Sequence, residues 1–268
     1  MENKDPLKQS IEEVKKVTIC PGYSKSGFKE QFESLSFYSG QTVAIVGPTG
    51  SGKSRLLEDI ECGAKGNTPT GRRILVNDKT WSNGKGQGKR EKIVAQLSQN
   101  MNFVIDLTVE EFLDMHARCW VSGDFTERIE RILELANSLT GESFDMSSNV
   151  GQLSGGQSRA LMIADCALLS PAPIVLIDEI ENAGINRRKA LEILTGENKI
   201  VFLATHDPLL ALLASTRIVI KNGSIDRVIK RTKREEETLS KLEIEDNEML
   251  KLRTVMRDGG MLEEGGLI

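Results

Sequence analysis

A glycine-rich octapeptide, Gly-Pro-Thr-Gly-Ser-Gly-Lys-Ser at residues 47–54, constrains the fold of this chain more than any other feature. The apolar run Thr42–Val46 precedes it and is typical of a buried parallel strand. Residues 53–62 are predicted to form a helix. Glycines let successive backbone N–H groups turn toward one anion, and the N-terminus of the following helix faces the same anion. The segment therefore predicts the phosphate-binding unit of an α/β fold.

The octapeptide matches the pattern G-x-x-x-x-G-K-S/T, which serves the binding of a nucleoside triphosphate. We expect the Lys53 ammonium to contact the β- and γ-phosphates of ATP and the Ser54 hydroxyl to coordinate Mg²⁺. Arg55, the next residue, is included in the expected site. The predicted ATP-binding residues of this segment are Gly47, Pro48, Thr49, Gly50, Ser51, Gly52, Lys53, Ser54 and Arg55.

The second candidate catalytic element is the apolar run 174–177, which ends at two acidic residues, Asp178 and Glu179. We expect Asp178 to hold Mg²⁺, directly or through water. Glu179 is placed to polarise an attacking water as general base. An acid at the end of a strand is common by itself. Together with the phosphate-binding loop it indicates ATP hydrolysis.

Composition narrows the remaining function classes. The net charge of -4 and the aromatic content of 4% argue against a nucleic-acid ligand. The four cysteines form no CxxC pair, which favours reduced thiols in a cytosolic protein over a metal or redox site. Residues 1–16 lack the apolar core of a signal peptide, and no stretch of about 18 apolar residues predicts a membrane span.

The rest of the chain predicts an α/β organisation with an inserted helical segment at about residues 105–165. Short apolar runs bounded by turn residues favour strands. Strands are expected at 14–19, 74–76, 93–97, 174–177 and 200–204, a helix at 188–194, and a hairpin of residues 217–220 and 224–229. A strand, a helix and a second strand in sequence are typical of a parallel sheet.

Two amphipathic helices are predicted inside the insert. Thr108 and Glu111 form the Thr-x-x-Glu capping box of the first, whose apolar face is expected to carry Phe112, Met115 and Cys119. His116 is interpreted as a surface residue of this helix. The second helix is predicted from the helical spacing of Phe125, Ile129, Ile132, Leu133, Ala136 and Leu139.

The remaining segments are predicted from their charge and glycine content. Residues 230–257 are heavily charged and are predicted to form one or two surface helices, whereas 259–268 are glycine-rich and expected to be mobile. Residues 83–90 are interpreted as a basic surface loop. We therefore expect a nucleotide-binding domain at 1–229 and a charged helical tail at 230–268.

The pentapeptide Leu153-Ser154-Gly155-Gly156-Gln157 lies between the phosphate loop and the acidic strand end. In this position it resembles the signature sequence of the ATP-binding cassette (ABC) ATPases. The resemblance implies a P-loop NTPase core with a mainly parallel sheet, an antiparallel β portion and an inserted helical subdomain that carries the signature. It also implies that two such domains pair head to tail, so that the signature of one covers the γ-phosphate held by the other.

The resemblance assigns further roles. His206, in Ala-Thr-His-Asp, is similar to the switch histidine that contacts the γ-phosphate. Gln99 resembles the Q-loop glutamine that reaches Mg²⁺ and the water, with Gln96 as the alternative. Tyr23 looks like the aromatic residue that stacks on adenine, with Phe28 as the alternative. The implied catalytic residues are Lys53, Glu179 and His206, and the implied magnesium ligands are Ser54, Gln99 and Asp178.

One segment departs from the family pattern. The residues after the catalytic glutamate usually read Pro-Thr-Ser-Ala-Leu-Asp, whereas this chain has Ile-Glu-Asn-Ala-Gly-Ile at 180–185. Ile185 therefore stands where the D-loop aspartate is expected, and Asn186 replaces it only if the loop is shifted by one residue. The departure puts in doubt the coupling between two paired sites. It leaves the prediction of ATP binding intact.

Two functions agree with these features. The first is a transporter motor, which would pair with a second ABC domain and dock under separate membrane-spanning subunits. The second is a soluble ABC ATPase that activates or remodels a protein complex. For both we expect ATP and Mg²⁺ as cofactors, no direct contact with nucleic acid, and a cytoplasmic location. For the transporter motor, this location is peripheral on the cytoplasmic face of a membrane.

Overall fold

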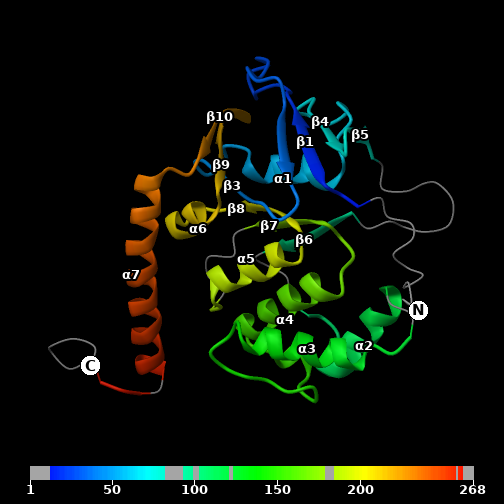
Figure 1. Cartoon of the computed structure of the whole chain (residues 1–268), viewed down its shortest axis with the longest axis vertical. Coiled ribbons are helices and arrows are strands. Elements are labelled where there is room, and N and C mark those ends of the chain that lie inside the picture. The colour runs from blue at the N-terminus through cyan, green and yellow to red at the C-terminus, as the bar shows by residue number, and fades with distance from the viewer. Residues whose placement is uncertain are drawn as a thin grey trace.

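A six-stranded sheet carries the glycine-rich loop (Figure 1). The computed structural model describes residues 13–81, 93–98, 103–120, 123–178, 184–257 and 259–261. The strands follow the order β10-β9-β3-β8-β7-β6, and all neighbours are parallel except β10 and β9. These strands are β3 (Thr42–Val46), β6 (Val94–Ser98), β7 (Ile174–Asp178), β8 (Ile200–Ala204), β9 (Thr216–Lys221) and β10 (Ser224–Lys230).

The inner strands β3, β7 and β8 are buried along almost their whole length. Parallel strands covered on both faces need apolar side chains on both, which explains their unbroken apolar sequences. The predicted strand–helix–strand unit is confirmed, because α5 (Arg187–Gly196) connects β7 to its parallel neighbour β8. The predicted hairpin is confirmed as β9 and β10, which pair in antiparallel register.

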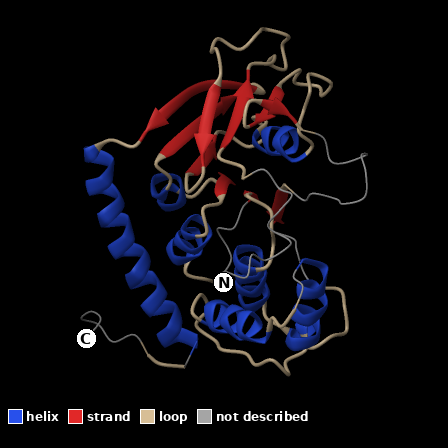
Figure 2. Cartoon of the chain, turned by 45° about the vertical axis from the view of Figure 1, so that its right-hand side comes forward, coloured by secondary structure: helices blue, strands red, loops and turns tan. Residues whose placement is uncertain are grey.

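A second, four-stranded antiparallel sheet has the order β2-β1-β4-β5. Helix α1 (Lys53–Glu61) packs against strands of both sheets. Figure 2 shows the strands of the two sheets in red and the helices around them in blue. Phe37 and Phe202 meet edge to face across the two sheets, with ring centroids 5.4 Å apart. The strands are β1 (Lys16–Cys20), β2 (Leu35–Tyr38), β4 (Arg73–Val76) and β5 (Lys79–Thr80). Strands β2 and β5 were not predicted, because only Phe37 is buried in β2 and both residues of β5 are exposed, so neither strand has an apolar run.

The predicted helical insert is confirmed. It comprises α2 (Val109–Trp120), α3 (Thr126–Asn137), a 3₁₀ turn (Val150–Gln152) and α4 (Gly155–Leu168). These helices lie together on the far side of α5 from the antiparallel sheet (Figure 1). The predicted spacing of α3 is confirmed, since Ile129, Ile132 and Ala136 are buried. They pack in one apolar cluster with α4 and one face of the six-stranded sheet.

The start of α2 is as predicted, but its buried face is not. Thr108 and Glu111 form the capping box: the Thr108 N–H donates to Glu111 Oε2 at 2.8 Å, and the Glu111 N–H donates to Thr108 Oγ1 at 3.2 Å. The buried residues are Val109, Leu113 and Ala117, with Phe112 half-buried. Met115 is 44% exposed and Cys119 is exposed, so their assignment to the apolar face was wrong. The buried residues and the pair Met115 and Cys119 both have helical spacing, so only packing against the rest of the insert decides which face is buried.

The interpretation of His116 as a surface residue was also wrong. Its Nδ1 lies 2.7 Å from Asp165 Oδ1 of α4, and its Nε2 accepts a hydrogen bond from the Trp120 indole N–H at 2.9 Å. Because the indole only donates, Nε2 is the acceptor and the Nδ1 proton faces the carboxylate. His116 therefore links α2 to α4.

The charged tail forms a single helix, α7 (Lys233–Arg257), which runs beside α6 (Pro208–Leu213) as Figure 1 shows. Its Leu239 and Leu242 are half-buried, and α7 is in contact with α6. Ion pairs join it to the body of the structure at Glu235–Arg217, Glu243–Arg188 and Asp246–Arg187. The predicted loop at 83–90 and residues 262–268 of the tail lie outside the described residues.

We expect Thr108→Ala to lower the free energy of unfolding by about 1 kcal/mol, because the hydroxyl that caps the Glu111 N–H and donates to Glu111 Oε2 is lost. Urea denaturation measures the change. Thr238→Ala, in the second turn of α7, is the matched control: its hydroxyl donates back to the Arg234 carbonyl oxygen and caps no helix end, so the loss should be smaller. Equal losses in the two variants would contradict the capping role of Thr108.

Candidate functional site

The ends of four parallel strands form one row at an edge of the sheet. Ser98 at the end of β6 pairs with Asp178, Asp178 with Ala204, and Ala204 with Ile45 of β3. The glycine-rich loop, Asp178 and His206 therefore leave the sheet on the same side. Crevices at the carboxyl ends of parallel strands are the usual ligand sites of α/β folds.

The loop between β3 and α1 depends on two glycines. Gly47 has φ = 154°, and a Cβ at this position would lie 2.3 Å from the Ile220 carbonyl oxygen. Gly52 has φ = 110°, and a Cβ there would lie 3.1 Å from Cα of Gly223. The β9–β10 hairpin thus presses against the loop and excludes side chains. Gly52 also precedes α1 with no capping side chain, so the N-terminal N–H groups of α1 remain available to an anion.

Lys53 is 7% exposed and reaches back over the loop. Its Nζ donates to the carbonyl oxygens of Gly47 at 3.1 Å and Pro48 at 3.4 Å. The same Nζ lies 2.9 Å from His206 Nε2. An ammonium only donates, so Nε2 accepts and the ring proton is on Nδ1 of the imidazole. Two predicted site residues from distant parts of the chain are thereby brought into contact.

A cavity of about 650 Å³ opens beside the loop. Eight predicted residues line it: Tyr23, Thr49, Gly50, Gly52, Lys53, Ser54, Arg55 and His206. Gly47, Pro48 and Ser51 are not among its lining residues. Ser51 is buried, and its carbonyl oxygen accepts a hydrogen bond from the Gly223 N–H at 2.7 Å. Gly47 and Ser51 lie against the β9–β10 hairpin, whereas Pro48 is exposed.

Several lining residues were not predicted. Lys25 donates from Nζ to the Gly50 carbonyl oxygen at 2.6 Å and thus adds a second cation next to the loop. The others are Ser24, Glu58, Pro69, Thr70 and Gly223. None belongs to a motif with fixed spacing.

Tyr23 forms one wall of the cavity. Its N–H donates to the Thr70 carbonyl oxygen at 2.7 Å, and its ring packs against Gly71, where a Cβ would lie 2.9 Å from Cδ2. Half of the Tyr23 surface is exposed, which leaves the ring accessible to a planar ligand. Phe28, the alternative, is 75% exposed. The geometry favours Tyr23.

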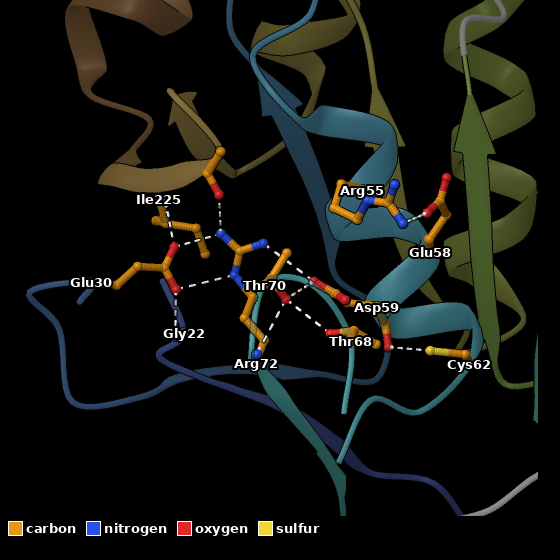
Figure 3. A network of polar contacts seen from close by, with 11 residues as sticks. Gly22, Glu30, Arg55, Glu58, Asp59, Cys62, Thr68, Thr70, Arg72 and Ile225 are labelled. Atoms are coloured by element: carbon orange, nitrogen blue, oxygen red, sulfur yellow. Dashed lines mark hydrogen bonds and ion pairs between the residues drawn. The ribbon is translucent and has the colours of Figure 1, made fainter. Parts of the chain in front are cut away.

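A buried ionic network supports this wall (Figure 3). Arg72 is fully buried and binds Glu30 through two nitrogens, with Nε to Oε2 at 3.1 Å and Nη2 to Oε1 at 2.5 Å. Its Nη1 contacts Asp59 Oδ2 at 3.3 Å, and Nη2 also donates to the Gly223 carbonyl oxygen at 2.8 Å. A planar guanidinium matches this arrangement better than an ammonium does.

The same network fixes the backbone around Tyr23. Glu30 accepts hydrogen bonds from the N–H of Gly22 at 2.7 Å and of Ile225 at 2.6 Å. The Thr70 hydroxyl donates to Asp59 Oδ2 at 2.8 Å. The network therefore joins the aromatic wall, α1 and the β9–β10 hairpin into one unit.

The signature pentapeptide lies at the N-terminus of α4. Ser154 and Gln157 form a capping box: the Ser154 N–H donates to Gln157 Oε1 at 2.8 Å, and the Gln157 N–H donates to Ser154 Oγ at 3.3 Å. Leu153 is half-buried against the apolar cluster of the insert. In the described part of the chain, none of Leu153, Ser154, Gly155, Gly156 and Gln157 lines the cavity beside the phosphate loop.

The acidic strand end is only partly described. Asp178 is half-buried at the end of β7. Glu179 and Gln99 lie outside the described residues, and their assignments stay predictions. Gln96 lies within β6, opposite Leu176, before the strand end that Gln99 follows.

Sequence comparison decides the family. A family model described as ABC transporter matches residues 32–182. An uncharacterized ABC transporter ATP-binding protein of Methanocaldococcus jannaschii is 49% identical over 251 residues, which cover 93% of this chain and 95% of that protein. The chain belongs to the ABC transporter family.

Further comparisons agree with membership in the ABC family. The macrolide export ATP-binding/permease protein MacB of Campylobacter jejuni is 30% identical over 232 residues, or 83% of this chain but only 35% of MacB. A dimeric ATP-binding cassette in a post-hydrolysis state, bound to ADP and Pi, has a TM-score of 0.57 and 25% identity, covering 81% of this chain and 99% of that one. For cbiO1 of Clostridium perfringens, part of the cbiONQ transporter complex, the TM-score is 0.62, the identity 20%, and the coverage 91% and 98%. The predicted α/β P-loop fold is confirmed.

The segment that departs from the ABC pattern is partly visible. Ile185 is 5% exposed and forms an isolated bridge with Thr140 of the insert. The Asn186 side chain caps α5 by accepting a hydrogen bond from the Lys189 N–H at 3.0 Å. An apolar residue is therefore buried where the family places an aspartate.

We expect Arg72→Met to lower the free energy of unfolding by about 3–5 kcal/mol, because it leaves two buried carboxylates without their cation. Chemical denaturation measures the loss. Arg55→Met removes an exposed pair with Glu58 within α1 and should cost far less. A similar loss of unfolding free energy in both variants would contradict the larger contribution expected from the buried network.

Proposed function

We propose that this chain is the ATP-hydrolysing subunit of an ABC transporter, which pairs with a second ABC domain around ATP. The observation that carries the proposal is the contact between Lys53 and His206 at the edge of the cavity. A phosphate-binding lysine and a histidine from another strand end face the same space, beside an exposed tyrosine wall. This arrangement suits the terminal phosphate of a nucleotide at one end and its base at the other.

Lys53 and α1 supply the binding of the phosphates. The ammonium contacts the β- and γ-phosphates, and the first N–H groups of α1 donate to the same anion. The bonds from Lys53 to Gly47 and Pro48 hold the ammonium over the loop. Lys25, which binds the Gly50 carbonyl oxygen, adds positive charge beside the loop. Tyr23 stacks on the adenine.

His206 senses the terminal phosphate. Because Nε2 accepts a hydrogen bond from Lys53, it offers no proton to an oxygen in this arrangement. A phosphate oxygen between the two side chains replaces that contact. The imidazole can donate to that oxygen only in the tautomer that carries the proton on Nε2.

The residues at the strand ends fit a magnesium ion. Ser54 lines the cavity, Asp178 ends β7, which lies two strands away from β3, and Gln99 follows β6 in the sequence. Hydroxyl, carboxylate and amide oxygens are the donors that Mg²⁺ takes together with ATP phosphates. The ion supplies charge stabilisation of the phosphates when bound. Glu179, adjacent to Asp178, acts as general base for the attacking water.

The position of the signature supports a dimer. Ser154 and its neighbours lie at the N-terminus of α4 and do not line the cavity of their own chain. The N–H groups at a helix start, together with the serine hydroxyl, form an anion site. We infer that the signature residues Leu153 to Gln157 complete the phosphate site of a second ABC domain.

Transport is the favoured use of this activity, because relatives over most of the chain are named as transporter ATP-binding proteins. Within the described residues, every helix is too short or too polar to span a bilayer. The proposal assigns the membrane-crossing part to separate subunits and places this chain on the cytoplasmic face of the membrane. The alternative, a soluble ATPase that remodels a protein complex, is favoured by the buried Ile185 at the D-loop position.

We expect Lys53→Ala to raise the Kd for ATP about 10- to 100-fold, since charge-assisted hydrogen bonds worth about 1.5–3 kcal/mol are lost. Fluorescence titration with a labelled ATP analogue measures the affinity. Lys65→Ala, an exposed lysine outside the cavity, is the control. Unchanged affinity and turnover in Lys53→Ala would refute the assignment of the loop.

Glu179→Gln should retain ATP binding, lose most hydrolysis and accumulate a closed dimer in ATP. Light scattering reports the dimer, and a pull-down of the same tagged variant after mild cross-linking identifies its partners. Lys53→Ala with ATP is the control. A polytopic membrane protein in stoichiometric amount supports transport, whereas a soluble enzyme or assembly factor alone supports remodelling. A monomer under all conditions contradicts the paired site.

A further inference from the structure

The first residue of α5, Arg187, connects the nucleotide site to the C-terminal helix. Its Nη1 pairs with Asp207 and its Nη2 with Asp246 of α7. The three side chains are 14%, 16% and 27% exposed, in that order, so this ion triad is shielded from solvent to a large extent. Shielded ion pairs are less weakened by salt than surface pairs.

Asp207 is the residue after His206, and its carboxylate has two tasks. Its Oδ1 accepts hydrogen bonds from the N–H groups of Leu209 at 2.7 Å and Leu210 at 3.2 Å, which begins α6. Its Oδ2 accepts from Arg187. The turn that carries His206 is thus attached to α5 through the guanidinium.

The other side of this turn is attached to the sheet. The Thr205 N–H donates to the Ile45 carbonyl oxygen at 3.2 Å, and the Asp207 N–H donates to Thr205 Oγ1 at 2.9 Å. His206 stands between these two anchors, with Nε2 2.9 Å from Lys53. A change in the position of Arg187 therefore acts on one of the two anchors of the histidine.

Asp246 is the part of this triad that lies outside the nucleotide-binding body. A guanidinium between two carboxylates is held from both sides, because its planar fork presents separate nitrogens to each. Without Asp246, Arg187 keeps Asp207 as a partner but loses the contact that fixes its far end. The expected consequence is a less ordered Arg187 and a less constrained turn at His206.

We propose that Asp246 of α7 is a positioning residue for ATP turnover, which acts through Arg187 and Asp207 on His206. The inference rests on the proposed ATPase function. It gives the C-terminal helix a role in the chemistry, since any event that moves α7 away from α5 also removes Asp246 from Arg187.

The chain provides a matched control for this inference. Glu243 lies one helical turn before Asp246 and pairs with Arg188 at 2.6 Å. Arg188 also pairs with Glu192 within α5. Glu243→Gln therefore removes an ion pair that docks the same helix on the same neighbour, without touching the Asp207 contact. A role of α7 in docking alone predicts equal effects of the two substitutions.

The experiment compares wild type, Asp246→Asn and Glu243→Gln in the full chain. We expect kcat of Asp246→Asn to fall about fivefold, at the lower end of couplings between sites, with KM for ATP little changed. Glu243→Gln should remain near wild type. Amide hydrogen exchange of residues 205–210 should rise in Asp246→Asn only, and Asp246→Glu, which restores the carboxylate, should recover part of the turnover.

The outcomes separate the inference from the function on which it rests. Wild-type protein without any ATP turnover contradicts the proposed function and the inference together. Wild-type turnover with equal kcat in Asp246→Asn and Glu243→Gln overturns the inference alone. Hydrogen exchange that is unchanged at 205–210 in Asp246→Asn also overturns it, whatever the activity.

Discussion

The buried contact between Arg72, Glu30 and Asp59 holds together parts of the molecule that share no strand pairing. Through it the loop before Tyr23, helix α1 and the β9–β10 hairpin have one common anchor. Buried ions are costly unless each finds partners. Arg72 binds both carboxylates, and Glu30 also accepts two backbone N–H groups, whereas Asp59 accepts only through Oδ2 and its buried Oδ1 has no hydrogen-bond partner among the described residues. The hairpin in turn presses on Gly47 and Gly52. The shape of the phosphate loop therefore depends on a network that contains no residue of the loop.

The candidate site could be predicted from the sequence where the expected chemistry requires a fixed spacing. The loop around Lys53, the strand end at Asp178 and the signature at Ser154 follow such patterns, and the first two meet at one edge of the sheet. Lys25 and Thr70 reach the cavity through loop conformation alone, and Arg72 acts from behind it. No local pattern marks such residues, because their neighbours come from distant parts of the chain.

The errors in the helical insert have a similar cause. Helical periodicity identified α2 and its cap at Thr108, but two apolar stripes competed, and burial selected Leu113 rather than Met115. His116 was placed at the surface because its partner Asp165 lies on another helix. Periodicity describes one helix at a time, whereas the choice of face is made by the neighbours.

The pairing of β3 has a consequence for synthesis of the protein. Val43 pairs with Phe202 on one side and with Thr216 on the other, so both neighbours of this strand come from the last third of the chain. Such distant pairings form late, because a long loop must close before they contribute any stability. Since domains fold as the ribosome releases them, the strand before the phosphate loop waits for almost the whole chain. A nascent chain that ends before β8 and β9 would expose this apolar strand without its partners.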